Sequence, residues 1–144
     1  MVLRELTLRY APSPVPLDRP AMRTPRDAAT IARQLLEGEP LEVFGAFMLN
    51  AQHGVLCWKE ISRGSLSSTV VMPRDVFFAA VHANAHALIL AHNHPSGDPA
   101  PSVQDRDLTH GLQVAGGMLG IDVADHIIIG DGGRYASFKE LGLL

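Results

Sequence analysis

Apolar and polar residues alternate along several short stretches of the chain, and this spacing predicts β-strands. In residues 2–10, Leu6 and Leu8 fall on one side of an extended chain and polar residues on the other, so we predict a strand at the edge of a sheet. Three further strands are predicted over residues 41–50, 55–62 and 65–72. Because turn residues separate these strands at 50–54 and 63–64, we expect an antiparallel meander.

A second spacing, with apolar residues three and four positions apart, predicts helices. The predicted helices cover residues 25–37, 73–84 and 103–119. Thr24 and Ser102 are typical N-caps, and Gly38 and Gly120 are typical helix ends. The residues expected to face inward are Ile31, Leu35, Leu36, Val76, Phe77, Ala80, Val81, Leu108, Leu112 and Ala115. Residues 11–25 are rich in proline and are expected to form an extended connector.

Two apolar stretches later in the chain predict strands that are covered on both faces. They are residues 87–91 and 121–130, and a last short strand is expected over residues 135–138. Strands alternate with helices there, while the earlier hairpins exclude a purely parallel sheet. We therefore predict an α/β fold with a mixed central sheet and helices on both of its faces.

Composition narrows the range of possible functions. The 144 residues fit one domain, with 47% hydrophobic and 19% charged residues. A net charge of −3 without a strongly basic run gives no electrostatic footprint for nucleic acid. Cys57 is the single cysteine, which excludes a disulfide framework and a cysteine-based zinc cluster. The sequence starts without the pattern of a signal peptide and has no run of membrane-spanning length, so we expect a cytoplasmic protein.

The residues best suited to chemistry lie in one stretch, 91–105, between an apolar strand and a helix. His92 and His94 are two positions apart, so their rings project to the same side of an extended chain. Ser102 and Asp105 lie three apart at the start of the next helix, and both can point back toward the histidines. Ser-x-x-Asp is also a helix-capping pattern, which is compatible with such a site. Two imidazoles and a carboxylate form a common catalytic zinc set that leaves the fourth position for water.

Other polar residues have less direct interpretations. Asp98 is a candidate ligand but suits a turn better, and Ser96 is expected to bond within the turn or to a ligand. His126 is either a partner of the metal ligands or, more often for such a residue, a satisfied core histidine. Cys57 is expected to act as a small hydrophobic residue. The histidines expected to be surface or packing residues are His53, His82, His86 and His110.

The stretch His-Asn-His-Pro-Ser-Gly-Asp-Pro-x-Pro-Ser-x-x-Asp resembles the motif of the JAB/MPN metalloproteases, in particular their RadC branch. Residues 73–77 and 125–130 are also similar to that branch, and the resemblance extends over residues 41–144. It implies a cytidine-deaminase-like α-β-α sandwich and one zinc ion held by His92, His94 and Asp105. It also implies an upstream glutamate as general base. Glu42 matches the family position better than Glu60, which is the alternative.

The resemblance implies hydrolysis of a peptide or isopeptide amide, with Ser102 donating a hydrogen bond to the developing oxyanion. The alternatives are a RadC-type binding module in DNA repair or mobile elements, and a metal-dependent phosphodiesterase. A deaminase would need His-x-Glu and Pro-Cys-x-x-Cys, which are missing.

Residues 1–40 differ from the helix-hairpin-helix region of full-length RadC proteins, and we expect them to pack on the domain formed by residues 41–144. A peptide or protein is the expected partner. We expect no strong binding to nucleic acid and no membrane association. The predicted edge strand could pair with that of a second chain to form a homodimer.

Overall fold

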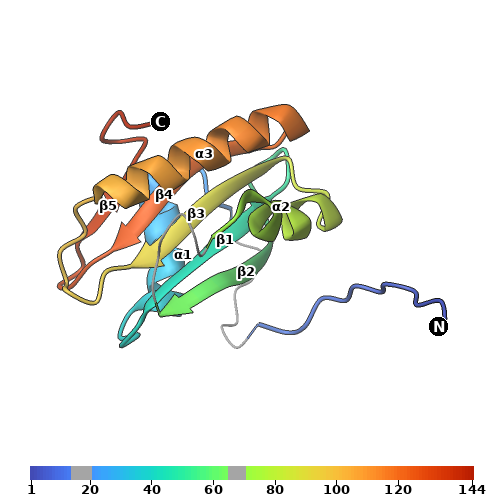
Figure 1. Cartoon of the computed structure of the whole chain (residues 1–144). Coiled ribbons are helices and arrows are strands. Elements are labelled where there is room, and N and C mark those ends of the chain that lie inside the picture. Colours follow the sequence, from blue (N-terminus) through green and yellow to red (C-terminus); the bar gives the residue numbers. More distant parts are fainter. Residues whose placement is uncertain (14–20, 65–70) are drawn as a thin grey trace.

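Five strands form one open sheet in the computed structural model, which describes residues 1–13, 21–64 and 71–144 (Figure 1). The strand order across the sheet is β2-β1-β3-β4-β5. Within the described residues the strands are β1 (Glu42–Leu49), β2 (Val55–Gly64), β3 (Ala87–Asn93), β4 (Asp122–Ile129) and β5 (Tyr135–Ser137). The helices there are α1 (Pro25–Leu36), α2 (Pro73–His82) and α3 (Val103–Leu119).

The sheet is mixed, as the sequence predicted. β1 pairs antiparallel with both β2 and β3, while β3 and β4 run parallel and are connected through α3. β5 pairs antiparallel with β4 at the other side of the sheet. β3 therefore lies in the centre, and its carboxyl end is where the histidine-rich turn begins. This is the edge at which open α/β sheets usually carry their sites.

Helices cover both faces of the sheet, so the predicted three-layer α-β-α arrangement is confirmed (Figure 1). α1 packs on one face, where buried side chains such as Ile31 and Leu36 meet Phe47 and Ile127. α2 and α3 pack on the other face, where Phe77 and Leu112 belong to the second core cluster. The two cores are separated by the sheet, because successive residues of each buried strand point to opposite faces.

Local sequence signals explain where the helices begin and end. Thr24 and Ser102 each accept a hydrogen bond from the third residue of the helix they precede. In both helices that third residue is an aspartate whose carboxylate accepts the N–H of the capping residue, which completes a capping box. Gly120 ends α3 with φ 70°, a left-handed conformation that glycine adopts without strain.

One predicted core residue lies at the surface. Val76, Phe77 and Ala80 of α2 are buried, but Val81 is 54% exposed. Successive helical residues are rotated by about 100°, which puts Val81 roughly a quarter turn from the centre of the buried stripe. Its inclusion among the inward-facing residues was therefore wrong.

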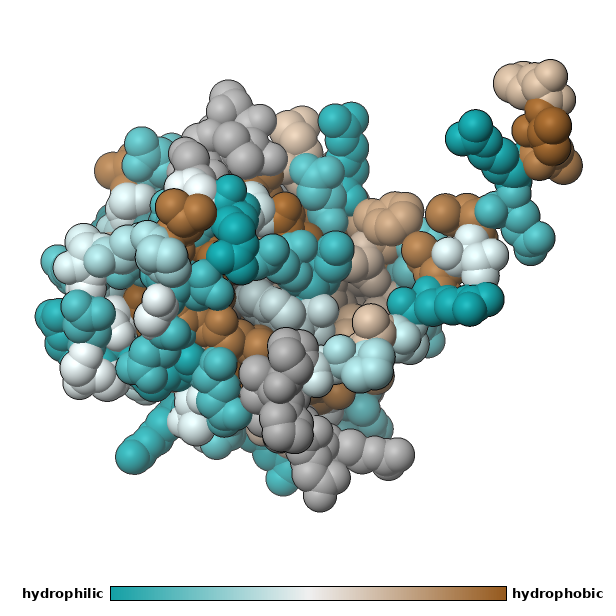
Figure 2. All heavy atoms as spheres, turned by 90° about the horizontal axis from the view of Figure 1, so that it is seen from below, coloured by the Kyte–Doolittle hydropathy of each residue, from teal (hydrophilic) through white to brown (hydrophobic). Residues whose placement is uncertain are grey.

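The strand predicted over residues 2–10 is not formed. These residues are exposed and extend away from the rest of the molecule (Figures 1 and 2). Leu6 and Leu8 are 69% and 45% exposed, so the side on which they lie is not buried against the rest of the protein. A strand also needs a neighbour for its backbone hydrogen bonds, and none of the described strands pairs with this stretch.

Two other predicted stretches fall largely outside the described residues. They are the third strand of the meander, at 65–72, and the middle of the proline-rich connector, at 14–20. Val71 and Met72 precede α2 without belonging to a strand. Where the connector ends, Ala21 forms a single bridge with Gly54 of the β1–β2 turn. Among the described residues, no helix combines the length and apolar character that crossing a membrane requires.

Candidate metal centre

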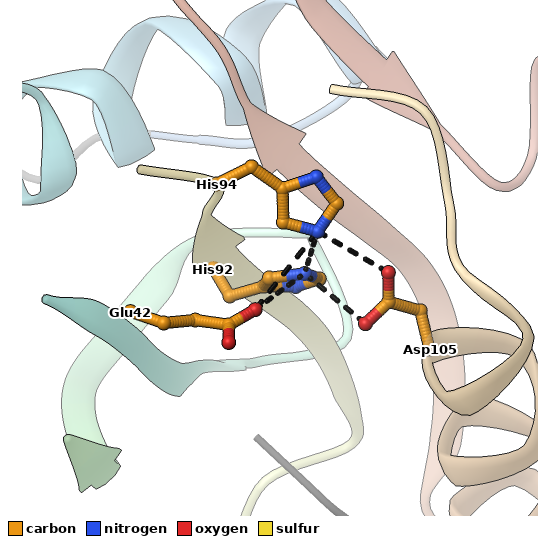
Figure 3. Close-up of side chains that lie close together, drawn as sticks. All are labelled: Glu42, His92, His94 and Asp105. Atoms are coloured by element: carbon orange, nitrogen blue, oxygen red, sulfur yellow. Dashed lines mark hydrogen bonds and ion pairs between the residues drawn. The ribbon is translucent and has the colours of Figure 1, made fainter. Parts of the chain in front are cut away.

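Four side chains from three elements converge at the carboxyl end of β3 (Figure 3). His92 and His94 stand at the end of β3 and in the turn after it, and Asp105 lies in the first turn of α3. Glu42 opens β1, which is antiparallel to β3, so the start of one strand lies beside the end of the other. One nitrogen or oxygen atom from each residue lies within 4.8 Å of the others.

The distances fit a metal-binding group. Asp105 bridges the two rings, with Oδ1 3.3 Å from His92 Nε2 and Oδ2 3.3 Å from His94 Nε2. The two Nε2 atoms are 2.9 Å apart. Bonds of about 2.1 Å to a tetrahedral zinc separate neighbouring ligand atoms by roughly 3.4 Å, close to the carboxylate-to-imidazole spacing found here. Two neutral imidazoles and one carboxylate also suit zinc chemically.

Glu42 stands slightly farther from the rings than Asp105 does. Its Oε1 is 3.7 Å from His92 Nε2 and 3.9 Å from His94 Nε2. Its side chain is 24% exposed, whereas that of Asp105 is only 3% exposed. Glu42 is therefore at the open side of the cluster, and the two histidines and Asp105 form its buried part.

Electrostatics keep Asp105 ionised although it is buried. Burial alone would raise the pKa of this carboxyl group, but hydrogen bonds from His92, His94 and the Ser102 N–H hold it well below its usual value. The bond to Asp105 in turn raises the pKa of His94, in opposition to its partial burial. The site thus presents a fixed negative charge to the two imidazole nitrogens, which favours a cation there.

Each histidine is oriented by its second nitrogen. His94 Nδ1 is 2.7 Å from the carbonyl oxygen of Asp98 and donates to it, because a carbonyl oxygen only accepts. His92 Nδ1 is 2.7 Å from Nε2 of His126, which is fully buried between the rings of Phe44 and Phe138. Burial lowers the pKa of His126 well below its ordinary value, so its ring is neutral. His126 is therefore both a hydrogen-bond partner of a candidate ligand and a buried core residue, so the two interpretations from the sequence both apply.

The remaining candidates from the sequence have other positions. Ser102 contacts Asp105 through its backbone N–H at 2.8 Å, and its Oγ accepts the Asp105 N–H at 3.1 Å, so the capping role is present beside the site. Asp98 accepts the N–H of Ala100, and Ser96 accepts that of Asp98, as turn residues do. His53, His82, His86 and His110 are exposed, and Cys57 is half-buried.

Glu60 lies apart from the histidines. Its Cα pairs with that of Gly45 on β1, and its carboxylate forms an ion pair with Arg63 at 2.6 Å. It is not part of the four-residue group found among the described residues. The structure therefore brings Glu42, and not Glu60, to the site.

The sequence reasoning missed two residues that hold the site together. Asn93 is 4% exposed, and its amide accepts the N–H of Val43 at 2.7 Å and donates to the carbonyl of Leu41 at 2.9 Å. It thereby fixes the backbone on both sides of Glu42. Thr109 lies one helical turn after Asp105 and touches His126 at 2.6 Å. The i,i+4 spacing from Asp105 was a signal for Thr109, but nothing in the sequence pointed to Asn93 beyond its place between the two histidines.

Comparison with known proteins identifies the family. Residues 22–143 match the model of the RadC-like JAB domain. The chain belongs to the RadC-like JAB domain family. A UPF0758 protein of Symbiobacterium thermophilum is 43% identical over 143 residues, which cover 99% of this chain and 61% of that protein.

Other relatives agree with this assignment. A UPF0758 protein of Desulfitobacterium hafniense is 45% identical over 94% of the chain and 60% of its own length. A third, from Desulforudis audaxviator, is 47% identical over 87% of the chain and 54% of its own length. The chain thus spans somewhat more than half the length of these relatives. Their names state no activity, so the chemistry of the RadC-like JAB domain has to be argued from its site.

Proposed function

We propose that this RadC-like JAB domain is a zinc-dependent hydrolase that cleaves an amide bond of a peptide or protein, either a peptide or an isopeptide bond. The observation that carries the proposal is the convergence of two imidazole Nε2 atoms on one buried carboxylate, with a second, more exposed carboxylate at the edge. Structural zinc sites have four protein ligands, whereas catalytic sites have three and keep one position open. Three candidate ligands with a free base beside them match the catalytic arrangement.

Each residue has one task in this proposal. His92, His94 and Asp105 would hold the ion, which supplies a Lewis acid and lowers the pKa of a water to about 7. Glu42 takes a proton from the attacking water and later delivers it to the leaving amine. Its distance of 3.7–3.9 Å from the ligand nitrogens suits a base that acts through water and does not itself bind the metal.

Ser102 is proposed to stabilise the negative charge that develops on the substrate oxygen. Its Oγ already accepts the Asp105 N–H, so the hydroxyl lies directly beside the ligand set. A single donor of this kind contributes about 3–4 kcal/mol of transition-state stabilisation in other enzymes.

The test compares three carboxylate variants for zinc content and for cleavage of a panel of peptide and isopeptide amides. Asp105→Ala removes a ligand, so it should lose zinc and activity together. Glu42→Gln keeps the shape of the base but cannot accept a proton, so it should retain zinc and lose roughly 10²–10⁴-fold in turnover. Glu60→Gln is the matched control, since Glu60 lies on the neighbouring strand away from the site, and it should keep both.

Each contrary result has a defined meaning. A parent protein that binds no zinc, even after zinc is supplied, would contradict the proposal. If Glu42→Gln lost zinc as Asp105→Ala does, Glu42 would be a ligand. If Glu42→Gln turned over at the parent rate, the base would be another residue. Cleavage of phosphodiesters in place of amides would replace the proposed reaction class.

A further inference from the structure

A chain of buried hydrogen bonds runs from α3 through β4 to the zinc-binding end of β3. Thr109 Oγ1 lies 2.6 Å from the backbone carbonyl of Asp105 and 2.6 Å from Nδ1 of His126. His126 Nε2 lies 2.7 Å from Nδ1 of His92. Thr109 and His126 are 1% and 0% exposed, so water does not compete for these groups.

The donor and acceptor roles along this chain follow one from another. A carbonyl oxygen only accepts, so the single hydroxyl proton of Thr109 goes to Asp105. The Thr109 oxygen must then accept from His126 Nδ1–H, so the other ring nitrogen, Nε2, is the one that accepts from His92. His92 therefore donates from Nδ1, which leaves its Nε2 as the ring nitrogen that faces the site and is available to a metal.

His94 is oriented by a shorter route. Its Nδ1 donates to the carbonyl of Asp98, so its Nε2 is the nitrogen that faces the site and is available to a metal. The two Nε2 atoms then lie 2.9 Å apart beside the carboxylate of Asp105. A cation held between these two nitrogens and the carboxylate would be stabilised by all three groups.

We propose that Thr109 and His126 are positioning residues, which hold His92 in the one tautomer that can bind a metal through Nε2. The inference rests on the proposed zinc site and adds to it two residues that touch neither metal nor substrate. It differs from a packing role in one respect. Packing needs only the shape of the Thr109 side chain, whereas the relay needs its hydroxyl group.

Thr109→Val separates these two roles because it keeps the shape and removes the hydroxyl. Without that acceptor, nothing holds the His126 proton on Nδ1, so we expect it on Nε2, where it donates to His92 Nδ1. His92 would then carry its own proton on Nε2, facing the metal position. Thr109→Ser keeps the hydroxyl and should behave as the parent does.

A matched control is available in α1. Thr30 makes the same bond to the carbonyl four residues before it, Arg26, at 2.8 Å, but at an exposed position. Thr30→Val should leave the site unchanged.

Two measurements on all four proteins decide the question. The first is nitrogen-15 NMR of the histidine rings in metal-free protein at alkaline pH, which tells which nitrogen of His92 is protonated. The second is the zinc dissociation constant by competition with a chelator. We expect Nδ1–H in the parent and in Thr109→Ser, Nε2–H in Thr109→Val, and zinc binding in Thr109→Val weakened roughly 10–100-fold.

The contrary outcomes distinguish this inference from the proposed function. If the folded parent carried the His92 proton on Nε2, or if Thr109→Val kept the parent's tautomer and zinc affinity, the relay would be refuted while the zinc site stood. If the parent bound no zinc, the proposed function would fail, and the tautomer of His92 in parent and variant would still decide the relay. If Thr109→Val failed to fold, the tautomers of the parent and of Thr109→Ser would decide it.

Discussion

Asn93 connects the end of β3 to the start of β1, and replacing it tests how the fold holds Glu42. Its buried amide makes hydrogen bonds to the N–H of Val43 at 2.7 Å and to the carbonyls of Leu41 and Glu39 at 2.9 and 3.2 Å. Asn93→Ala removes all of them. Because a protein hydrogen bond contributes about 1 kcal/mol net, we expect the free energy of unfolding to fall by about 3 kcal/mol.

Thermal unfolding followed by circular dichroism measures this loss. For a chain of this size 1 kcal/mol shifts Tm by about 2–4 °C, so the expected decrease is roughly 6–12 °C. The proposed zinc ligands stand on β3 and α3, so bound zinc should be retained below the new Tm. Turnover should fall, because the backbone on either side of Glu42 loses its anchor.

Asn50→Ala is the matched control for this experiment. The Asn50 amide oxygen accepts the N–H groups of Gln52 and Gly54 at 2.9 Å each, but in a turn that is open to solvent. Water can replace these bonds, so we expect a loss of at most about 1 kcal/mol. If Asn93→Ala melted at the temperature of Asn50→Ala or of the parent, the buried amide would not be what fixes the start of β1, and the reasoning would be refuted.

Three further predictions concern the turn, a buried acid and nucleic acid. In Gly130→Ala the new Cβ would lie 2.5 Å from the carbonyl oxygen of Gly97 and 2.7 Å from Cδ of Pro99. Urea unfolding should therefore show that the free energy of unfolding falls by about 1–3 kcal/mol. The control is Gly117→Ala, in open space on α3, which should be neutral or slightly stabilising. Burial raises the pKa of Asp125, so its proton is held more tightly in the folded state, and its contribution to stability is present below about pH 4 and lost as pH rises through the raised pKa. The slope of Tm against pH across that range should therefore be more negative, or less positive, in the parent than in Asp125→Asn, and equal slopes would contradict this. With a net charge of −3, the chain should not bind duplex DNA strongly at physiological salt, and submicromolar binding in a fluorescence titration would disprove that.

The part of the site that lies close together in sequence was predictable. His92, His94 and Asp105 are fixed by a strand end, a proline turn and a helix cap, all of which are local signals. The bounds of α1 and α3 follow from the same kind of signal, in Thr24, Ser102 and Gly120.

Long-range pairing was beyond the reach of local patterns. Glu42 and Glu60 both lie on strands, and although the family resemblance favoured Glu42, the physical reason is the register, which pairs Glu60 with Gly45. The contacts of Asn93 with β1 and of Thr109 with His126 depend on how distant elements dock. The stretch 2–10 illustrates the opposite error, because alternation alone does not make a strand when no partner strand is beside it.

Asp105 takes part in the site twice, and this has a mechanical consequence. Its carboxylate faces His92 directly, and its backbone carbonyl reaches the same histidine through Thr109 and His126. These contacts close a ring that clamps the first turn of α3 to the end of β3. With an ion bound there, the first turn of α3 could not unwind without breaking a metal ligand, so unwinding of that turn would also release the ion. The amide protons of the first turn of α3 should then exchange with solvent no faster than the metal is released.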